Sequence, residues 1–177
     1  MKYVYETRMM VRDYECDIEG IVNNANYLHY TEHTRHLFLQ HCGLSFADMH
    51  RKGVDAVVAR MNLKFKTPLV PDDTFISRLG IKKDGIKYVF YQDIFRESDE
   101  RLCFSGVIEI VCLVNGRLAN SDDYDRALAK YLTNYTNERA ATVIQHSPHA
   151  YRSFQPCLCP LSLSHIGQRR GDLSASQ

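Results

Sequence analysis

Asp17 and the residues that follow it are the best candidates for chemistry in this chain. Gly20 lies just downstream and suits a tight turn, because a residue without Cβ tolerates positive φ at little steric cost. Asn23 and Asn24 come next, and short amide side chains often accept hydrogen bonds from the free N–H groups that start a helix. An ionised carboxylate beside a helix N-terminus could act as a nucleophile or as a general base. The alternative is an Asx-turn in which Asp17 has no chemical role.

A long amphipathic helix is predicted directly after this loop. Residues recur at helical spacing through 27–41, so that one mostly apolar stripe can face a core: Tyr27, Tyr30, Thr31, Thr34, Leu37, Phe38 and His41. The opposite side carries Glu32 among histidines, which we interpret as a solvated face or, alternatively, as the position of a rival catalytic carboxylate. Gly43 is expected to end the helix, because glycine adopts the left-handed conformation common there.

Strands are predicted before and after this helix in the sequence. Residues 3–11 mix β-branched and aromatic side chains and predict a first strand that enters the Asp17 loop. After a short second helix at 45–52, a two-residue period predicts a half-buried strand at 55–66. Its expected buried face consists of Val57, Ala59, Met61, Leu63 and Phe65.

Three more strands complete the predicted sheet, at residues 74–83, 87–96 and 101–114. Asp84-Gly85 is a strong hairpin signal, because two-residue turns of this type need positive φ at both central positions. Short connections make consecutive strands antiparallel, so we expect a four-stranded meander that the first strand can join. The sequence therefore predicts an α+β fold in which an antiparallel sheet wraps around a long central helix.

The 177 residues suit one domain of ordinary size followed by a tail. A last helix is expected at 122–133 with Ser121 as its cap, so the domain is placed at residues 1–134. Residues 135–177 hold three of the five prolines and no sustained period, and we expect a tail that is poorly ordered or docks only weakly. Cys157-Leu158-Cys159 does not match the spacing of structural zinc sites, so no metal is expected.

Composition excludes several classes of function. The formal net charge of +1 gives no global field for nucleic acid or an anionic membrane. The chain contains no run approaching the ~20 apolar residues that span a bilayer, and its start lacks the apolar segment of a secretory signal. Its six cysteines are irregularly spaced, which fits reduced thiols better than a disulfide framework. A cytoplasmic protein without a cofactor is expected.

The run from Cys16 to Tyr27, CDIEGIVNNANY, closely resembles the signature of the 4-hydroxybenzoyl-CoA thioesterase and acyl-CoA thioester hydrolase branch of the hotdog-fold superfamily. The resemblance covers roughly residues 1–134 and implies a hotdog fold. It implies that Asp17 is the catalytic carboxylate, and that the Asn26-Tyr27 pair opens the central helix. Asn23 and Asn24 depart from the aromatic that many members carry and resemble the corresponding run of acyl-carrier-protein thioesterases.

The resemblance gives the chemistry of the loop a specific form. A thiolate leaves readily, so thioester hydrolysis needs an attacking oxygen and an oxyanion donor more than a strong general acid. We expect Asp17 to supply the first requirement and the backbone N–H of Asn24 the second. Gly20, Asn23 and Tyr27 are expected to contribute to substrate binding.

Coenzyme A carries phosphates, which a nearly neutral protein must meet with local cations. Arg60, Lys82 and Lys83 are the candidates, with Lys64, Lys66 and Lys87 nearby; solvation of a charged surface is the ordinary alternative. Hotdog enzymes build active sites between subunits, so the resemblance also implies a homodimer or a homotetramer. The expected substrate is an acyl-CoA or, alternatively, an acyl-ACP.

Three alternatives to this hypothesis are a different enzyme on the same fold, a protein that only binds its ligand, and a different nucleophile. A dehydratase on the same fold is disfavoured, because such enzymes resemble one another in a histidine before the helix and residues 17–26 contain none. A non-catalytic acyl-thioester binding module would use the same groove. Cys16 as a nucleophile is disfavoured, because an ordinary thiol is mostly protonated near neutral pH.

Overall fold

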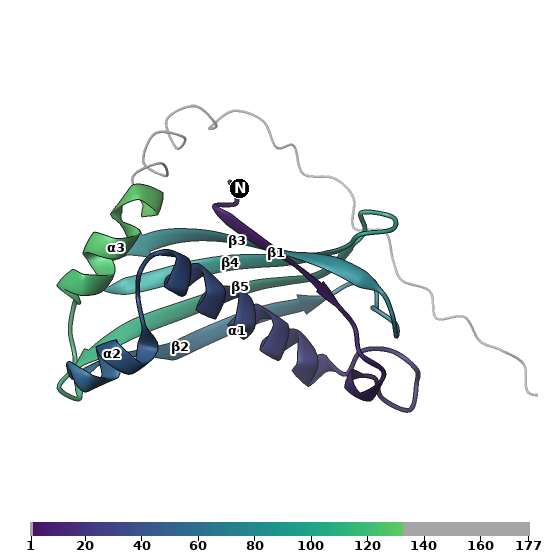
Figure 1. Ribbon diagram of the computed structural model, residues 1–177, viewed down its shortest axis with the longest axis horizontal. Helices are drawn as coiled ribbons and strands as arrows, with labels where there is room; N and C mark the ends of the chain where they lie inside the picture. The colour runs from purple at the N-terminus through teal and green to yellow at the C-terminus, as the bar shows by residue number, and fades with distance from the viewer. Residues whose placement is uncertain (1, 133–177) are drawn as a thin grey trace, which may run out of the picture. The chain divides into compact units, whose positions relative to one another are not determined.

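The computed structural model describes residues 2–132, whose strands form one antiparallel sheet (Figure 1). The long strands lie in the spatial order β1-β3-β4-β5-β2, and the short β6 pairs with β5. The strand bounds are β1 Tyr5–Met10, β2 Val54–Phe65, β3 Thr74–Asp84, β4 Lys87–Arg96, β5 Leu102–Val114 and β6 Arg117–Leu118.

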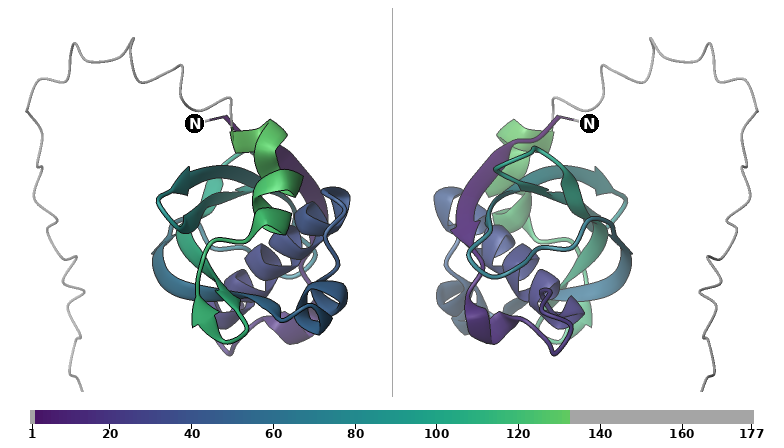
Figure 2. Two further views of the ribbon diagram at one scale, coloured as in Figure 1. Left: turned by 90° about the vertical axis from the view of Figure 1, so that its left-hand side faces the viewer. Right: turned by 90° about the vertical axis from the view of Figure 1, so that its right-hand side faces the viewer.

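The sheet curls around one long helix, as the end-on views show (Figure 2). This helix, α1, comprises Asn24–His41, and the shorter helices are α2 (Phe46–Arg51) and α3 (Asp122–Leu132). A 3-10 turn, η1 (Asp13–Glu15), precedes the Asp17 loop. The predicted α+β fold, an antiparallel sheet wrapped around a central helix, is confirmed.

Local sequence signals explain where α1 begins and ends. Asn23 caps its N-terminus by accepting a hydrogen bond from the Ala25 N–H (3.0 Å), and Gly43 follows its C-terminus with φ of +81°. Most residues of the predicted stripe are buried, but the buried face of α1 is wider than that stripe. Arg35 and Leu39 are also buried, whereas His41 at the end of the stripe is exposed.

The core consists of two clusters at different positions along α1. Toward the N-terminal end, Tyr27 and Tyr30 pack with Phe75 and Phe104, and toward the C-terminal end Phe38 packs in a second cluster against strands β3 to β5. Each fully buried side chain of this size contributes roughly 1.5–3 kcal/mol. The two clusters fix α1 on the sheet, and with it the loop that leads into α1.

The position of β2 corrects the predicted meander. β3, β4 and β5 are consecutive neighbours, but β2 pairs with β5 and lies at the edge of the sheet, away from β3. The connection 66–73 contains Pro68 and Pro71 and is too long for a tight hairpin, so nothing forces β2 to pair with the next strand.

The predicted alternation along β2 is also only partly correct. Its register shifts between Val58 and Arg60, so Val58 pairs with the buried Ile110 while Met61 pairs with the buried Ile108. Met61, Leu63 and Phe65 share the inner face as expected, but a bulge at Ala59 moves Val57 to the other face. A bulge adds one residue and inverts a two-residue period, which is why the first half of the prediction is wrong.

The turn between β3 and β4 is one residue later than predicted. Asp84 pairs with Lys87, which leaves Gly85 and Ile86 as the central residues, and only Gly85 has positive φ (+60°). A glycine at the first central position is the requirement of a type II′ turn, whereas the prediction assumed positive φ at both positions.

Several expectations concern residues outside the described range. They are the tail at 135–177, its separation from a domain at 1–134, and the Cys157-Leu158-Cys159 segment. Within residues 2–132, no helix is long and apolar enough to cross a membrane. In the same range no group of three or more His, Cys, Asp and Glu side chains could hold a metal ion.

Candidate active site

The Asp17 loop is a closed turn held by its own backbone. The Asp17 N–H donates to the Ile21 carbonyl (2.9 Å), and the Gly20 N–H donates to the Asp17 carbonyl (3.0 Å). Gly20 has φ of +74°, the conformation for which a glycine was expected. The Asp17 Oδ1 accepts a hydrogen bond from the Glu19 N–H (3.1 Å), so the Asx-turn of the alternative interpretation is present. That turn occupies one carboxylate oxygen and fixes the side chain.

Glu15 connects this loop to the helix. Its side-chain carboxylate is buried and accepts hydrogen bonds from the Arg12 N–H (2.8 Å), the Arg12 guanidinium (3.0 Å) and the Tyr30 hydroxyl (2.7 Å). Its backbone carbonyl accepts from the Asn23 N–H (3.0 Å) and from the Asn26 side-chain amide (2.6 Å). Burial, and then the neighbouring Glu15 carboxylate, raise the pKa of the Tyr30 hydroxyl. Glu15 therefore sets the distance between the loop and the start of α1.

The amides at the N-terminus of α1 are used unequally. The Asn23 N–H donates to Glu15, the Ala25 N–H to the Asn23 side chain, and the Asn26 N–H to the Asn23 carbonyl (2.9 Å). Asn24 takes part in none of the hydrogen bonds that join residues 2–132 outside the helix ladder. Its N–H is an orphan donor at the positive end of the helix dipole.

Asp17 and Asn24 both line one cavity of about 280 Å³. Its wall includes Asp17 and Asn24, with mostly apolar neighbours: Ile21, Val22, Tyr27, Phe65, Lys66, Thr67, Pro68 and Cys103. Tyr27 stacks on Phe104 with ring centroids 5.5 Å apart. Its hydroxyl accepts a hydrogen bond from the Leu69 N–H (3.1 Å), and burial raises its pKa. The cavity thus combines one acidic residue, the Asn24 residue with its unpaired N–H and the cationic Lys66 with a mostly apolar wall.

Cys16 is a poor nucleophile in this setting. Burial, followed by the carboxylates of Asp17, Glu15 and Asp13, raises the pKa of its thiol. A thiol with a raised pKa is still more completely protonated at neutral pH than an ordinary cysteine, so the structure gives Cys16 no activation.

The cations expected to meet phosphates lie elsewhere in the chain. Lys83 forms an ion pair with Asp125 of α3, and Lys82 lies over the Tyr91 ring, 5.5 Å from its centroid. Arg60 is on the exposed edge strand β2. None of these three lines the Asp17 cavity, whereas Lys66 does. Glu32, the rival carboxylate, is exposed and lines a different cavity farther along α1.

Glu15 and Arg35 are the important side chains that the sequence analysis did not single out. Glu15 was not predicted as a site residue, because its hydrogen bonds matter only once the side chain is buried. Its spacing of three residues from Arg12 does fit a capping box across η1. Arg35 lies on the helix face between two predicted core positions, where a charge is unexpected. No short motif marks either residue.

Comparison with known families decides the membership of the chain. A family described as the thioesterase-like superfamily matches residues 11–147. The chain belongs to the thioesterase-like superfamily. A putative esterase of Aquifex aeolicus is 32% identical over 98 residues, covering 55% of this chain and 75% of that protein. A chloroplastic acyl-acyl carrier protein thioesterase of Arabidopsis thaliana is 33% identical over 91 residues, covering 51% of this chain and 48% of that protein. The chain thus spans about half the length of this plant relative.

Solved structures share the fold of this chain. A hypothetical protein of Thermus thermophilus matches with a TM-score of 0.66 and 28% identity, over 71% of this chain and 98% of that one. A 1,4-dihydroxy-2-naphthoyl-CoA thioesterase from Synechocystis matches with a TM-score of 0.66 over 71% of this chain and 95% of that one. Its 15% identity supports the fold alone. The hotdog architecture implied by the resemblance is confirmed.

Proposed function

We propose that this chain hydrolyses acyl thioesters to a free acid and a thiol, with Asp17 as its catalytic carboxylate. The observation that carries the proposal is that Asp17 and Asn24, whose N–H has no partner among residues 2–132, line the same cavity. Membership of the thioesterase-like superfamily supports it. The Asx-turn is compatible with this role, because only Oδ1 accepts the hydrogen bond of the turn. That bond fixes the orientation of the carboxylate and leaves Oδ2 to react.

Two forms of the reaction fit this geometry. As a nucleophile, Asp17 Oδ2 attacks the carbonyl carbon, the thiolate leaves, and water then hydrolyses the mixed anhydride. As a general base, the same oxygen takes a proton from the attacking water. In both, negative charge builds on the carbonyl oxygen, where the Asn24 N–H can stabilise it by roughly 3 kcal/mol. Gly20 keeps the loop in its turn, Asn23 holds the helix start, and Tyr27 lines the acyl side of the cavity.

Acyl-CoA is the substrate that we propose first, with acyl-ACP as the alternative. A putative acyl-CoA thioesterase of Bacillus subtilis is 32% identical over 55% of this chain, and a Staphylococcus aureus protein of the same fold was solved in complex with CoA. The Arabidopsis relative favours the carrier protein instead. Lys66 is the cation placed to meet the polar arm of either carrier. Arg60, Lys82 and Lys83 could serve only at another surface or in an assembly.

The assembly that we propose is a homodimer through β2, or a tetramer built from such dimers. β2 is an edge strand, and three apolar side chains on its inner face are substantially exposed: Val58 at 45%, Met61 at 38% and Phe65 at 49%. Long apolar edges invite pairing with another chain. Because Phe65 also lines the Asp17 cavity, a second copy along this edge would border the active site. Free thiols at Cys16, Cys42, Cys103 and Cys112 suit the cytoplasmic location expected from the sequence.

Thiol release from a panel of acyl-CoAs and acyl-ACPs tests the proposed activity. Asp17→Asn should lower kcat by roughly 10²–10⁴-fold, the range typical of a lost general base. Glu19→Gln is the matched control, because Glu19 is an exposed carboxylate of the same loop, and it should leave kcat unchanged. Turnover that survives Asp17→Asn and vanishes in Glu32→Gln would move the catalytic carboxylate to α1. Absence of turnover on every substrate would favour the non-catalytic binding module.

A further inference from the structure

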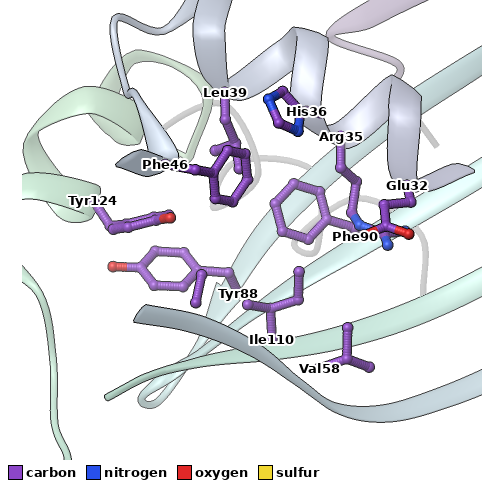
Figure 3. Close-up of a pocket in the computed structure, with 11 residues that line it drawn as sticks. Glu32, Arg35, His36, Leu39, Phe46, Val58, Tyr88, Phe90, Ile110 and Tyr124 are labelled. Carbon is purple, nitrogen blue, oxygen red and sulfur yellow. The ribbon is translucent and has the colours of Figure 1, made fainter. Parts of the chain in front are cut away.

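A second cavity, of about 360 Å³, lies between α1, α2, α3 and the inner face of the sheet (Figure 3). It does not share a lining residue with the Asp17 cavity. Most of its wall is aromatic or aliphatic, and three polar side chains of α1 complete it: Glu32, Arg35, His36, Leu39, Phe46, Ala56, Val58, Tyr88, Phe90, Ile110 and Tyr124. A cavity of this size with few polar groups is typical of small-molecule sites.

Arg35 is the unusual member of this wall. Its side chain is buried, with only 6% of the residue exposed, and Nη1 donates to the side-chain oxygen of Gln92 (2.6 Å). Gln92 is itself fixed, because its amide nitrogen donates to the Thr31 carbonyl (2.8 Å). The guanidinium is therefore held in one place by a neutral partner.

No carboxylate neutralises this buried cation at close range. None of the ion pairs found among residues 2–132 includes Arg35. Burial lowers its pKa to about 10, and the more distant Glu32 offsets only part of that effect. A charge that has lost its water and forms no ion pair is costly, so this site gains from an anion that can reach the guanidinium.

The charged side chains Arg35 and Glu32 lie at the same end of the cavity, the Tyr124 ring lies at the other end, and Phe46, Phe90 and Ile110 lie between them (Figure 3). A ligand that satisfies this arrangement has one charged end and an apolar body. Glu32 is exposed to solvent, which screens its charge more than that of the buried Arg35.

We propose that this cavity is a binding site for a small monocarboxylic acid, whose carboxylate pairs with the Arg35 guanidinium and whose apolar body contacts Phe46, Phe90 and Ile110. A guanidinium offers parallel donors that match both oxygens of a carboxylate, which an ammonium does not. The acid released from an acyl thioester belongs to this ligand class. That link rests on the proposed function, whereas the binding site itself does not.

Calorimetric titration of the full chain with octanoate and with its neutral analogue 1-octanol tests the site. Octanoate should bind at least tenfold more tightly than 1-octanol. Arg35→Met keeps the apolar stem and should remove this preference while leaving 1-octanol binding unchanged. Glu32→Gln removes a like charge and should tighten octanoate binding. Equal affinities of the two ligands for the wild type, or a preference that survives in Arg35→Met, would overturn the proposal, as would no binding of octanoate at all.

A second variant separates this cavity from the Asp17 cavity and covers the case in which Arg35→Met fails to fold. Ala56 lines the proposed site and not the catalytic one, so Ala56→Leu should fill the space and weaken octanoate binding at least tenfold. Unchanged binding in Ala56→Leu would place the ligand elsewhere and defeat the proposal. No thioester is present in these titrations, so a chain without hydrolytic activity would still give the same result.

Discussion

Glu15 links more of the candidate site than any other single side chain described above. It joins Arg12 before the 3-10 turn to Tyr30 on α1, and its carbonyl holds the backbone of Asn23. Hydrogen bonds to a buried charge are worth about 1.5–3 kcal/mol, roughly twice the value of neutral ones. The geometry between Asp17 and Asn24 therefore depends on a residue that forms a hydrogen bond with neither.

Replacement of Glu15 should damage both stability and catalysis. Glu15→Ala leaves the Tyr30 hydroxyl without its acceptor, so we expect a loss of about 2–3 kcal/mol in the free energy of unfolding, measured by urea denaturation. Tyr30→Phe removes one hydrogen bond to the buried Glu15 carboxylate and should cost about 1.5–3 kcal/mol. Wild-type kcat in a folded Glu15→Ala variant would contradict the positioning role.

At this scale, residues that form local turns and caps can be predicted from the sequence. Asp17, Gly20 and Asn23 are recognisable because turns and caps are built from neighbours in sequence. Arg35 and Glu15 were not found, because each matters only through burial against residues far along the chain, Gln92 in one case and Tyr30 in the other. A single sequence does not show which charges will be buried.

Helix α1 depends on its cap, and the cap can be tested separately from the carboxylate. Asn23→Ala removes the acceptor for the Ala25 N–H, and we expect a loss of about 1 kcal/mol in the free energy of unfolding. Asn23→Asp keeps an acceptor oxygen and should restore that stability. Equal losses in the two variants, measured by thermal or urea unfolding, would show that the cap is not what Asn23 contributes.

Strand β1 is tied to the end of β4 by an ion pair that gives a pH-dependent prediction. The Arg8 guanidinium donates hydrogen bonds to the Glu97 carboxylate (2.7–2.9 Å) and, as the largest cause, lowers the pKa of Glu97 to about 2. Because the folded pKa lies below the unfolded value, the stabilisation is present above about pH 4.5 and is lost as the pH falls toward 2.

The pH dependence of Tm measures this effect. The Tm difference between wild type and Glu97→Gln should be small at pH 6, because the side chains of Arg8 and Glu97 are exposed. This Tm difference should shrink further as the pH falls toward 2. A difference that grows with acidification would contradict the assigned sign. Arg78→Gln, which removes the neighbouring Glu6 pair, serves as a control for the general loss of surface charge.

Element boundaries were predicted well where one period continues, and poorly where a single residue interrupts it. β4 begins and ends where the two-residue period does. In β2 the bulge at Ala59 inverts the pattern, and in the β3–β4 hairpin the turn moves from Asp84-Gly85 to Gly85-Ile86. Both features are set by pairing with a neighbouring strand, which local sequence does not specify.

At the scale of the whole molecule, the layers were predictable and the strand order was not. One apolar helix stripe and a set of alternating strands leave few arrangements other than a sheet packed on a helix. β2 pairs with β5 at the edge of the sheet, and the 66–73 connection crosses from there to β3. This pairing joins strands far apart in the sequence, and no local sequence signal predicts it. That edge position exposes the inner face of β2.

Oligomeric state should therefore depend on β2 and not on the opposite edge. Met61→Glu places a charge on the exposed inner face of β2, and we expect the mass measured by light scattering to fall to that of a monomer. Met10→Glu is the matched control, because Met10 is 53% exposed on β1 at the other edge of the sheet. A Met61→Glu protein that keeps its assembled mass would rule out pairing along β2.

Asn24 and Arg35 belong to the same helix and are eleven residues apart, so the helix separates their backbones by about 16.5 Å along its axis. Inserting or deleting one residue between them would turn everything beyond it by about 100°. The guanidinium would then leave its cavity even if the Asp17 loop were untouched. Length changes in this part of α1 are tolerable only in steps near a full turn, so homologues that keep both cavities should not differ here by insertions or deletions of one or two residues.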